Sequence, residues 1–361
     1  MSENKTRRSG GRAARQAMRA APLAENIRPI RAGMEGGTYK PLSDRDMERI
    51  HETALCALET IGLADAPPSG VEIMTKAGAI LGDDNRLRFP RALVEDMLAK
   101  AAKEVILYSR DGKNDLVLSG NRVHYGTAGA AVHLVDVEHN EYRECTVQDL
   151  HDAARIMDRL DNVHFFQRPM VCRDITDNYE MDLNTIYASC SGTTKHVGTS
   201  ISEPAFVPGA LEMVYEIAGS EAAFRARPFV SSSNCFVVPP MKFATESCEV
   251  MELLIQGGMP ILLLSAGMSG ATTPASLAGA IAQATAECLA GLVYINAIKP
   301  GHPAIFGTWP FGLDLRTGAM SIGSGEQALL TAGCAQMHKF YGIPGGGPGG
   351  ASDAKMPDMQ A

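Results

Sequence analysis

From about residue 120 onward, hydrophobic and polar positions follow one repeated order. A short apolar run comes first, then a turn of small polar residues, then a helical pattern. Continuous apolar runs of this length are typical of strands buried on both faces of a parallel sheet. The pattern predicts strands that begin near residues 123, 163, 196, 228, 260, 303 and 341. It predicts helices at residues 146–160, 179–190, 208–219, 243–257, 274–298 and 324–340.

Seven strand–helix units predict an α/β protein with a (β/α)8 TIM barrel rather than an open sheet. An open sheet that binds a dinucleotide would carry GxGxxG in its first turn, and this chain has no such motif there. The repeat is one strand short of a closed barrel, and unpaired sheet edges are a liability. We therefore expect a barrel truncated before its last unit, in a piece of a longer protein. In such folds functional residues lie at the carboxyl ends of the strands.

The region before the repeat has a different pattern. Residues 42–63 form an amphipathic helix that Ser43 caps and Gly62 ends, and two more helices follow around a short exposed segment. Residues 104–145 resemble strands and tight turns, including a hairpin at 135–145. The predicted division is a basic, flexible arm at 1–32, a helical cap and lead-in at 33–120, and the incomplete barrel at 121–361.

Charge and composition narrow the class of protein. Residues 1–32 carry eight Lys and Arg against two acidic residues, so the remaining chain has 25 basic against 39 acidic residues. A body this acidic argues against nucleic-acid binding. The arm could be a transit peptide, a subunit contact or a solvated extension. With no secretory hydrophobic region, a cytoplasmic location is expected.

Two further features, the cysteines and residues 274–298, could suggest a disulfide-rich, metal-binding or membrane protein, but the sequence argues against each of these. The eight cysteines are scattered without a CxxC pair, so neither a disulfide framework nor a metal site is predicted. Residues 274–298 are long and apolar but contain Gln283, Glu287 and Asn296. We interpret them as a buried helix, capped by Thr273, rather than as a membrane span.

Several motifs, taken in order, resemble the trimethylamine methyltransferase family. They are YGTAGAAVHLVD, KHVGTSISEP, the run from GATTPASL to AIFGT, LDLRTGAMSIGSGEQAL, and KFYGIP followed by a glycine-rich end. The resemblance implies a TIM barrel that moves a methyl group from a methylated amine to the cobalt of a separate corrinoid-binding protein. No cofactor would then be bound permanently, because the methylcobamide is presented by the partner. A homo-oligomer is also expected.

The resemblance bears on the substrate as well. The founding members of the family carry pyrrolysine in or near the stretch that corresponds to Gly345–Gly350, where this chain has only glycines and Pro348. The chain therefore resembles the non-pyrrolysine branch, which includes enzymes that demethylate glycine betaine. Gly346, Gly347, Gly349 and Gly350 would allow close approach of the corrin ring. Transfer of a methyl cation needs no metal to activate the leaving amine, so the protein's task is positioning.

Aromatic faces and polar groups at the strand ends are the candidate amine ligands, and no residue is assigned a catalytic role. A quaternary ammonium binds aromatic faces, each contact contributing about 0.5–2 kcal/mol. The aromatic candidates are Tyr125, Phe166, Phe236, Trp309 and Phe311. The polar candidates are Gln167 and Asn234 for a substrate carboxylate, and Glu203, which could balance the ammonium or cap the next helix.

Other residues in these motifs have competing interpretations. Arg316 could bind a carboxylate, but an ion pair with Asp314 is favoured. His196 is expected to be a satisfied core histidine. A lysine that forms a Schiff base, Lys355 or Lys195, would instead indicate an aldolase-like lyase, although Lys355 with Asp353 resembles a loop ion pair. A non-catalytic protein that binds methylated amines is the remaining alternative.

Overall fold

The computed structural model describes residues 31–136 and 138–350, together with the single positions 16, 21, 354 and 359. The contacts between residues divide the chain into two compact units, Met1–Arg31 and Ala32–Ala361. Most of the predicted basic arm therefore lies outside the described residues. The second unit contains both the predicted cap and the predicted barrel, and its architecture is described below.

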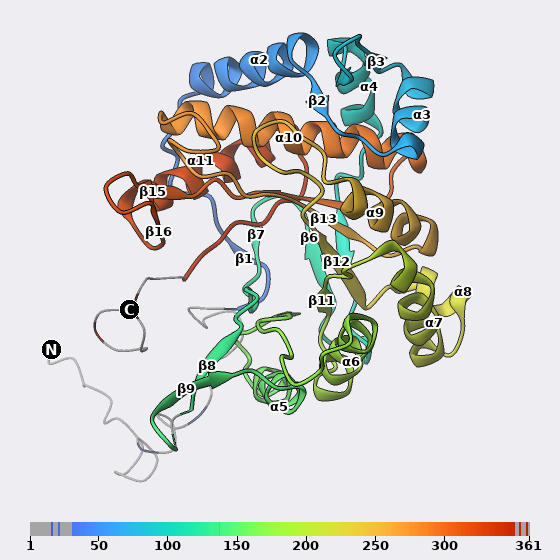
Figure 1. The fold of residues 1–361 in the computed structure, drawn as a ribbon. Coiled ribbons are helices and arrows are strands. Elements are labelled where there is room, and N and C mark those ends of the chain that lie inside the picture. The colour runs from blue at the N-terminus through green and yellow to red at the C-terminus, as the bar shows by residue number, and fades with distance from the viewer. Residues whose placement is uncertain are drawn as a thin grey trace, which may run out of the picture. The chain divides into compact units, whose positions relative to one another are not determined.

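A parallel sheet runs through this unit (Figure 1). Its five strands are β10 (Phe166–Gln167), β11 (Val197–Thr199), β12 (Val230–Asn234), β13 (Ile261–Ser265) and β14 (Ala304–Thr308), and each pairs with the next along the chain. A parallel bridge joins Gly126 to Phe165 at one edge, and another joins Phe306 to Gly345 at the other. All seven segments predicted as strands thus take part in one parallel ladder, and a mixed α/β fold with a parallel sheet is confirmed.

Helices connect the strands as the pattern predicted. They are α5 (Val147–Asp158), α6 (Asn178–Gly192), α7 (Val207–Ala218), α8 (Glu221–Ala226), α9 (Thr245–Gly257), α10 (Leu277–Ile298) and α11 (Gly325–Tyr341). Thr146 caps α5 in a capping box with Asp149, and Ser324 caps α11. The short helix α8 was not predicted.

The start of α10 corrects one expectation. Ser276, not Thr273, caps this helix, and its side chain accepts a hydrogen bond from the Gly279 amide. Thr273 belongs to the preceding turn, where its amide donates to Met268 and its carbonyl accepts from Gly270. A residue held in that turn cannot also begin the helix.

The segment before the repeat also has the predicted elements. Helices α2 (Asp44–Thr60), α3 (Pro68–Ala77) and α4 (Arg91–Lys100) accompany a small sheet of β2 (Leu63–Ala64), β3 (Ile80–Leu81) and β4 (Arg86–Arg88). Ser43 caps α2, and Gly62 adopts a positive φ of 66° just after its end. Further pairs are β1 (Met34–Glu35) with β7 (Arg122–Val123), β5 (Val105–Leu107) with β6 (Leu116–Leu118), β8 (His133–Asp136) with β9 (Glu141–Glu144), and β15 (Gly312–Asp314) with β16 (Ala319–Ser321).

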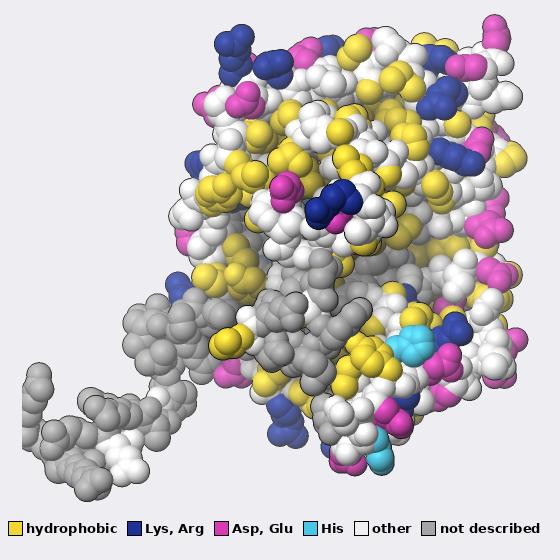
Figure 2. Space-filling model, turned by 60° about the vertical axis from the view of Figure 1, so that its left-hand side comes forward, with side chains coloured by type: hydrophobic (Ala, Val, Ile, Leu, Met, Phe, Trp, Pro, Cys, Tyr) yellow, Lys and Arg dark blue, Asp and Glu magenta, His cyan; other side chains and the backbone are white. Residues whose placement is uncertain are grey.

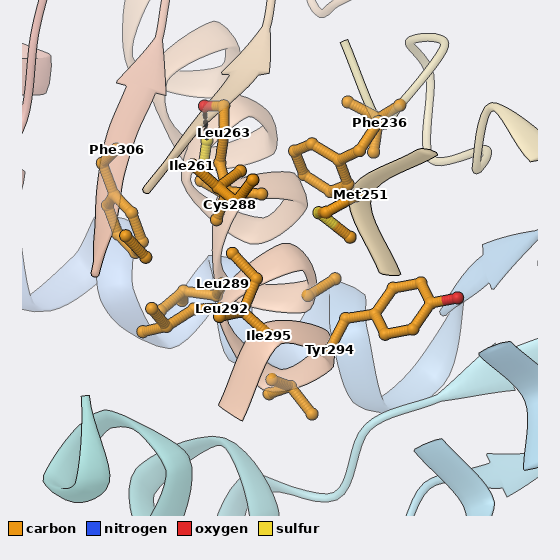
Figure 3. Packing of buried hydrophobic residues seen from close by; sticks show 14 of the residues in the cluster. Phe236, Met251, Ile261, Leu263, Cys288, Leu289, Leu292, Tyr294, Ile295 and Phe306 are labelled. Atoms are coloured by element: carbon orange, nitrogen blue, oxygen red, sulfur yellow. Dashed lines mark hydrogen bonds between the residues drawn. The ribbon is translucent and has the colours of Figure 1, made fainter. Parts of the chain in front are cut away.

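Helix α10 is the centre of the core. It packs against β13 and β14 on one side and against α2, α3 and α4 on the other (Figure 1). Figure 3 shows its side chains reaching both layers, with the Cys288 thiol donating to the Leu263 carbonyl at 3.7 Å. Among the described residues it is the one helix long and apolar enough to cross a membrane, yet 83% of its most apolar stretch is buried inside the protein. The expectation of a buried core helix agrees with this packing.

The sheet has two different faces because side chains alternate along each strand. On β13, Ile261, Leu263 and Ser265 are buried on the side of α10, whereas Leu262 and Leu264 are only half-buried. We call the side that bears Leu262 and Leu264, opposite α9, α10 and α11, the inner face. The hairpin β5–β6 covers part of it, through a hydrophobic cluster that joins Val105, Leu107 and Leu116 to Ile305 and Leu262. The uncovered part lies toward the carboxyl ends of the strands.

The close contact between α10 and the sheet gives a test of this packing. A methyl group added at Gly291 would lie 2.6 Å from the Phe236 ring and 2.9 Å from Leu263. We expect Gly291→Ala to lower the free energy of unfolding by about 1–3 kcal/mol through overpacking, although alanine favours helix. Gly325→Ala, in the first turn of α11 with open space around it, is the matched control and should not destabilise. Equal stability of both variants in urea denaturation would contradict the packing described.

Candidate functional site

The uncovered part of the inner face is lined by polar and apolar side chains without charge. By strand alternation, the side chains of Gln167, Ser233, Cys235, Leu264 and Trp309 lie on this face. The Gln167 side chain extends over Gly198, where an added methyl group would overlap its amide. Cys235 is exposed, and Ser233, Leu264 and Trp309 are half-buried. The surface at the carboxyl ends of the strands is therefore accessible, and its strand residues provide amide, hydroxyl, thiol and indole groups.

Trp309, the only tryptophan of the chain, is fixed at this surface. Its amide donates to the Ser265 carbonyl at 2.8 Å, and its indole Nε1–H donates to the Gly346 carbonyl at 2.8 Å. Gly346 in turn donates its amide to the Phe306 carbonyl at 2.8 Å. The indole is thus tied to the glycine-rich segment, with its polar edge satisfied and part of the side chain still accessible.

Behind the glycine-rich segment, His338 fixes the position of that backbone. His338 of α11 is buried, with its Nε2 2.5 Å from the Thr308 hydroxyl and its ring perpendicular to that of Phe306. Burial lowers the pKa of His338 to about 4, so the ring is neutral at neutral pH. A side chain at Gly345 would overlap this ring. Glycine at 345 therefore lets the segment lie directly on His338, which places the Gly346 carbonyl at the polar edge of the indole.

A cavity of about 370 Å³ adjoins the glycine-rich segment on the side of α11. Phe311 lies on its wall together with Gly349 and Gly350, and the α11 side contributes small residues such as Ala328 and Thr331. Gly347 approaches Thr331 closely, since an added methyl group would lie 2.9 Å from its Cγ2. Gly346, Gly349 and Gly350 have open space where a side chain would begin. Trp309 and Phe311 thus lie near different parts of the same backbone segment, Trp309 at Gly346 and Phe311 at the cavity that Gly349 and Gly350 line.

Four predicted site residues lie elsewhere. Asn234 donates to the Ser247 carbonyl of α9 at 3.0 Å, and Phe236 packs on Gly291 of α10, so both are on the helix side of the sheet. Phe166 is fully buried in a cluster against α5 and α6. Tyr125 precedes the first bridge of the ladder, at the amino end of the sheet. These placements correct the expectation that all four would line the carboxyl ends.

The two predicted charged ligands are on the surface. Glu203 is exposed at the start of a 3-10 turn, Pro204–Phe206, and its side chain makes no capping hydrogen bond. Arg316 pairs with Asp314 on the β15–β16 hairpin, with its Nε 3.3 Å from a carboxylate oxygen, and its side chain is 89% exposed. The favoured interpretation of Arg316 as a local ion pair is confirmed.

Lys195 and His196 both have structural roles. The Lys195 Nζ donates to the carbonyls of Met157, in the last turn of α5, and of Leu160 and Val163, beyond its end, at 2.7, 2.8 and 2.6 Å. These bonds occupy all three protons, which leaves no free amine for a Schiff base. His196 is buried between the Tyr108 carbonyl and the Ser231 hydroxyl, each at 2.9 Å, and is a satisfied core histidine. Asp353 and Lys355 lie outside the described residues.

The sequence analysis did not identify the group that supports the loop after β12. Glu287 of α10 is fully buried and accepts from the Ser265 hydroxyl at 2.5 Å, the Met241 amide at 2.8 Å and the Gln283 amide at 3.0 Å. Burial raises the pKa of Glu287. Glu287 is the one charged residue in an otherwise uncharged stretch. This feature argued against a membrane span, and it could also have indicated a buried carboxylate with hydrogen-bond partners. Among the described residues, no group of three His, Cys, Asp or Glu side chains could hold a metal ion.

Glu287 gives a pH-dependent prediction. Its folded pKa is raised, so the unfolding free energy of the native chain should fall relative to Glu287→Gln as the pH rises above the ordinary value of 4.5. Glutamine can keep the three hydrogen bonds, because its oxygen accepts from both amides and its amide donates to Ser265. Glu287→Ala leaves buried donors unpaired and should cost at least about 2 kcal/mol. Denaturation from pH 4.5 to 8.5 measures this, and a difference that does not change with pH would contradict it.

The arrangement of His338, Gly345 and Trp309 predicts a spectroscopic coupling. Gly345→Ala should displace the glycine-rich segment, lower the free energy of unfolding by about 1–3 kcal/mol and shift the emission of the single tryptophan to the red. Gly346→Ala, which has open space, should change neither quantity. The double variant Gly345→Ala/His338→Ala should restore the emission. Unchanged emission in Gly345→Ala would show that His338 does not position the indole through this segment.

Comparison with known proteins places this chain in a family. The trimethylamine methyltransferase (MTTB) family model matches residues 8–361. The trimethylamine methyltransferase of Desulfitobacterium hafniense is 30% identical over 331 residues, which cover 91% of this chain and 66% of that protein. The glycine betaine methyltransferase of another strain is 29% identical over 90% of this chain and 67% of its own length.

A relative from a different genus gives the same result. A trimethylamine methyltransferase of Methanosarcina mazei is 28% identical over 88% of this chain and 65% of its own length. The chain spans about two thirds of the length of the curated relatives that it matches. The expected resemblance is confirmed, and the chain belongs to the trimethylamine methyltransferase family.

Proposed function

We propose that this protein moves a methyl group from a quaternary or tertiary methylated amine to the Co(I) of a corrinoid held by a separate protein. The observation that carries the proposal is the indole of Trp309, fixed by Gly346 on an accessible face whose strand residues are uncharged. Relatives named for trimethylamine and for glycine betaine support the substrate class. Because the chain lacks pyrrolysine, a glycine betaine-like amine is the favoured substrate.

We propose a (β/α)8 barrel as the complete fold. The support is a parallel ladder of seven segments in sequence order, with helices on one face and the hairpin β5–β6 on the other. In such a barrel the inner face would line the interior, and its carboxyl end would be the site of chemistry. Gln167, Cys235 and Trp309 would then face a common space.

The methylated ammonium would bind against the indole face. A cation over a Trp ring gains about 0.5–2 kcal/mol, and more where water is excluded. In a closed barrel, the Gln167 amide and the Ser233 hydroxyl of the inner face would offer hydrogen bonds without placing a fixed charge beside the ammonium. The aromatic and polar groups would then orient one N–CH3 bond toward the carboxyl end of the sheet, which is the direction open to a partner.

The glycine-rich segment fits a large flat ring. Gly346, Gly349 and Gly350 have open space above their Cα atoms, so a corrin could approach the backbone closely. The corrinoid supplies the electron pair that accepts the methyl group as a cation. The C–N bonding pair stays with the nitrogen, which leaves as a neutral amine. The protein's part is to hold the amine, keep the segment in place through His338 and limit the access of water.

We also propose that the protein is cytoplasmic, forms a homo-oligomer and takes its corrinoid from the partner protein. On the face shown in Figure 2, Lys and Arg side chains are scattered among Asp and Glu rather than gathered into one basic patch.

The alternative function, a lyase that acts through Lys195, is not supported, because the Lys195 ammonium donates all its hydrogen bonds to backbone carbonyls.

The test is the formation of methyl-Co(III), followed by its absorbance, with the chain, a Co(I) corrinoid protein and a panel of methylated amines. Trp309→Phe should retain part of the activity, and Trp309→Ala should raise the KM for the amine about 2- to 30-fold. Tyr187→Ala, an exposed aromatic residue of α6, is the control for loss of a surface ring. No spectral change with any amine would refute the proposed function, and an unchanged KM in Trp309→Ala would refute the role of the indole.

A further inference from the structure

Ala266 lies next to Trp309 on the inner face, on the neighbouring strand. The Trp309 amide donates to the Ser265 carbonyl at 2.8 Å. Two residues further along, the Phe311 amide donates to the Gly267 carbonyl at 2.7 Å. These bonds continue the parallel ladder beyond the ends of β13 and β14 and put Ala266 in register with Trp309. Neighbouring strands are about 4.8 Å apart, so position 266 directly adjoins the tryptophan.

The indole itself extends away from β13. Its Nε1–H donates to the Gly346 carbonyl, and the glycine-rich segment lies along the opposite edge of β14, where Phe306 forms a bridge with Gly345. The other side of the ring is therefore turned toward Ala266. Because Trp309 is half-buried and Ala266 is exposed, the two residues border an accessible space.

Leu264 provides the floor of this space. It precedes Ala266 by two residues, so both side chains lie on the same face of the sheet. A methyl group added at Gly307 would lie 2.6 Å from the Leu264 Cδ2, which shows that the leucine side chain covers this glycine. Cys235, just after β12, is in register with Leu264 on its other side. We call the space bounded by Leu264, Ala266 and Trp309 the notch.

The notch is apolar and uncharged. Its walls are two aliphatic side chains and an indole whose N–H is already bonded to Gly346. The loops that begin after β12 and β13, residues 235–241 and 266–276, contain no Lys, Arg, Asp or Glu. A fully methylated ammonium has no N–H group that needs an acceptor. A protonated tertiary or secondary amine has one or two, and leaving them unpaired is unfavourable.

We infer that Ala266 determines specificity at the proposed amine site. Its small side chain leaves room beside the indole for the methyl groups of a quaternary ammonium, and a larger side chain at 266 would fill that room. The inference rests on the proposed function and narrows its substrate class to amines with a fully methylated nitrogen. A hydrophobic pocket that differs by one methylene discriminates about 10- to 200-fold, so position 266 has a measurable influence.

The experiment is isothermal titration calorimetry of the full chain with tetramethylammonium, trimethylammonium and dimethylammonium chloride. The parent should bind tetramethylammonium most tightly. Ala266→Val should weaken tetramethylammonium at least about 10-fold and dimethylammonium no more than about threefold, because the smaller head still fits. Ala266→Ser, of nearly the same size, should bind tetramethylammonium within about threefold of the parent.

The matched control is Ala275→Val, at an exposed alanine just before α10. It adds the same two methyl groups outside the notch and should bind all three ions like the parent. Because Ala266 is itself exposed, valine there overlaps no packed side chain, and the variant should fold. Circular dichroism and urea denaturation check this for each variant.

Equal weakening of all three ions by Ala266→Val, or no weakening, would overturn the inference, because position 266 would then not sense the size of the ammonium. A loss in Ala266→Ser as large as that in Ala266→Val would also overturn it. These binding results do not depend on methyl transfer. An unchanged preference in Ala266→Val with methyl-Co(III) still formed refutes this inference alone, whereas a parent chain that binds no ammonium ion refutes the proposed function as well.

Discussion

The packing of α10 against β13 and β14 is the constraint on which the rest of the structure depends. It requires a helix built from Ala and Gly, because Gly291 leaves room for the Phe236 ring and Leu263. With one face of the sheet sealed in this way, and the N-terminal helices packed on the far side of α10, the other face remains available. The same helix carries Glu287, which holds both the end of β13 and the loop after β12. One helix thus seals the core and holds both a strand end and a loop.

The strand–helix order of the repeat could be predicted because buried parallel strands and capped helices leave strong local patterns. Thr146, Ser324 and Gly342 end or begin helices where the pattern places them. The start of α10 could not be predicted this way, since both Thr273 and Ser276 are residue types that cap helices and the turn with Met268 decides between them. The role of Glu287 was equally hard to predict, because it depends on which groups of β13 and of the loop after β12 lie near the carboxylate in three dimensions.

The candidate site shows the limit of reasoning from strand ends. The sequence indicated which residues stand near the end of each strand but not which face they occupy, and a shift of one residue reverses the face. Asn234 and Phe236 are therefore on the helix side, while Cys235 between them is on the inner face. Tyr125 was misplaced for a related reason, because the register of a segment with a single bridge has little local signature. Trp309 and Gly346, both named as candidates from the sequence, lie together through a hydrogen bond that was not foreseen.

Function in this account depends on a fixed indole beside a glycine-rich segment, at the open end of the inner face. The measurement that tests it most directly is a nuclear Overhauser experiment between the N-methyl protons of bound glycine betaine and the single tryptophan of the chain. The account predicts cross-peaks from the methyl groups to the indole ring protons of Trp309. Measurable betaine binding without any such cross-peak would contradict it.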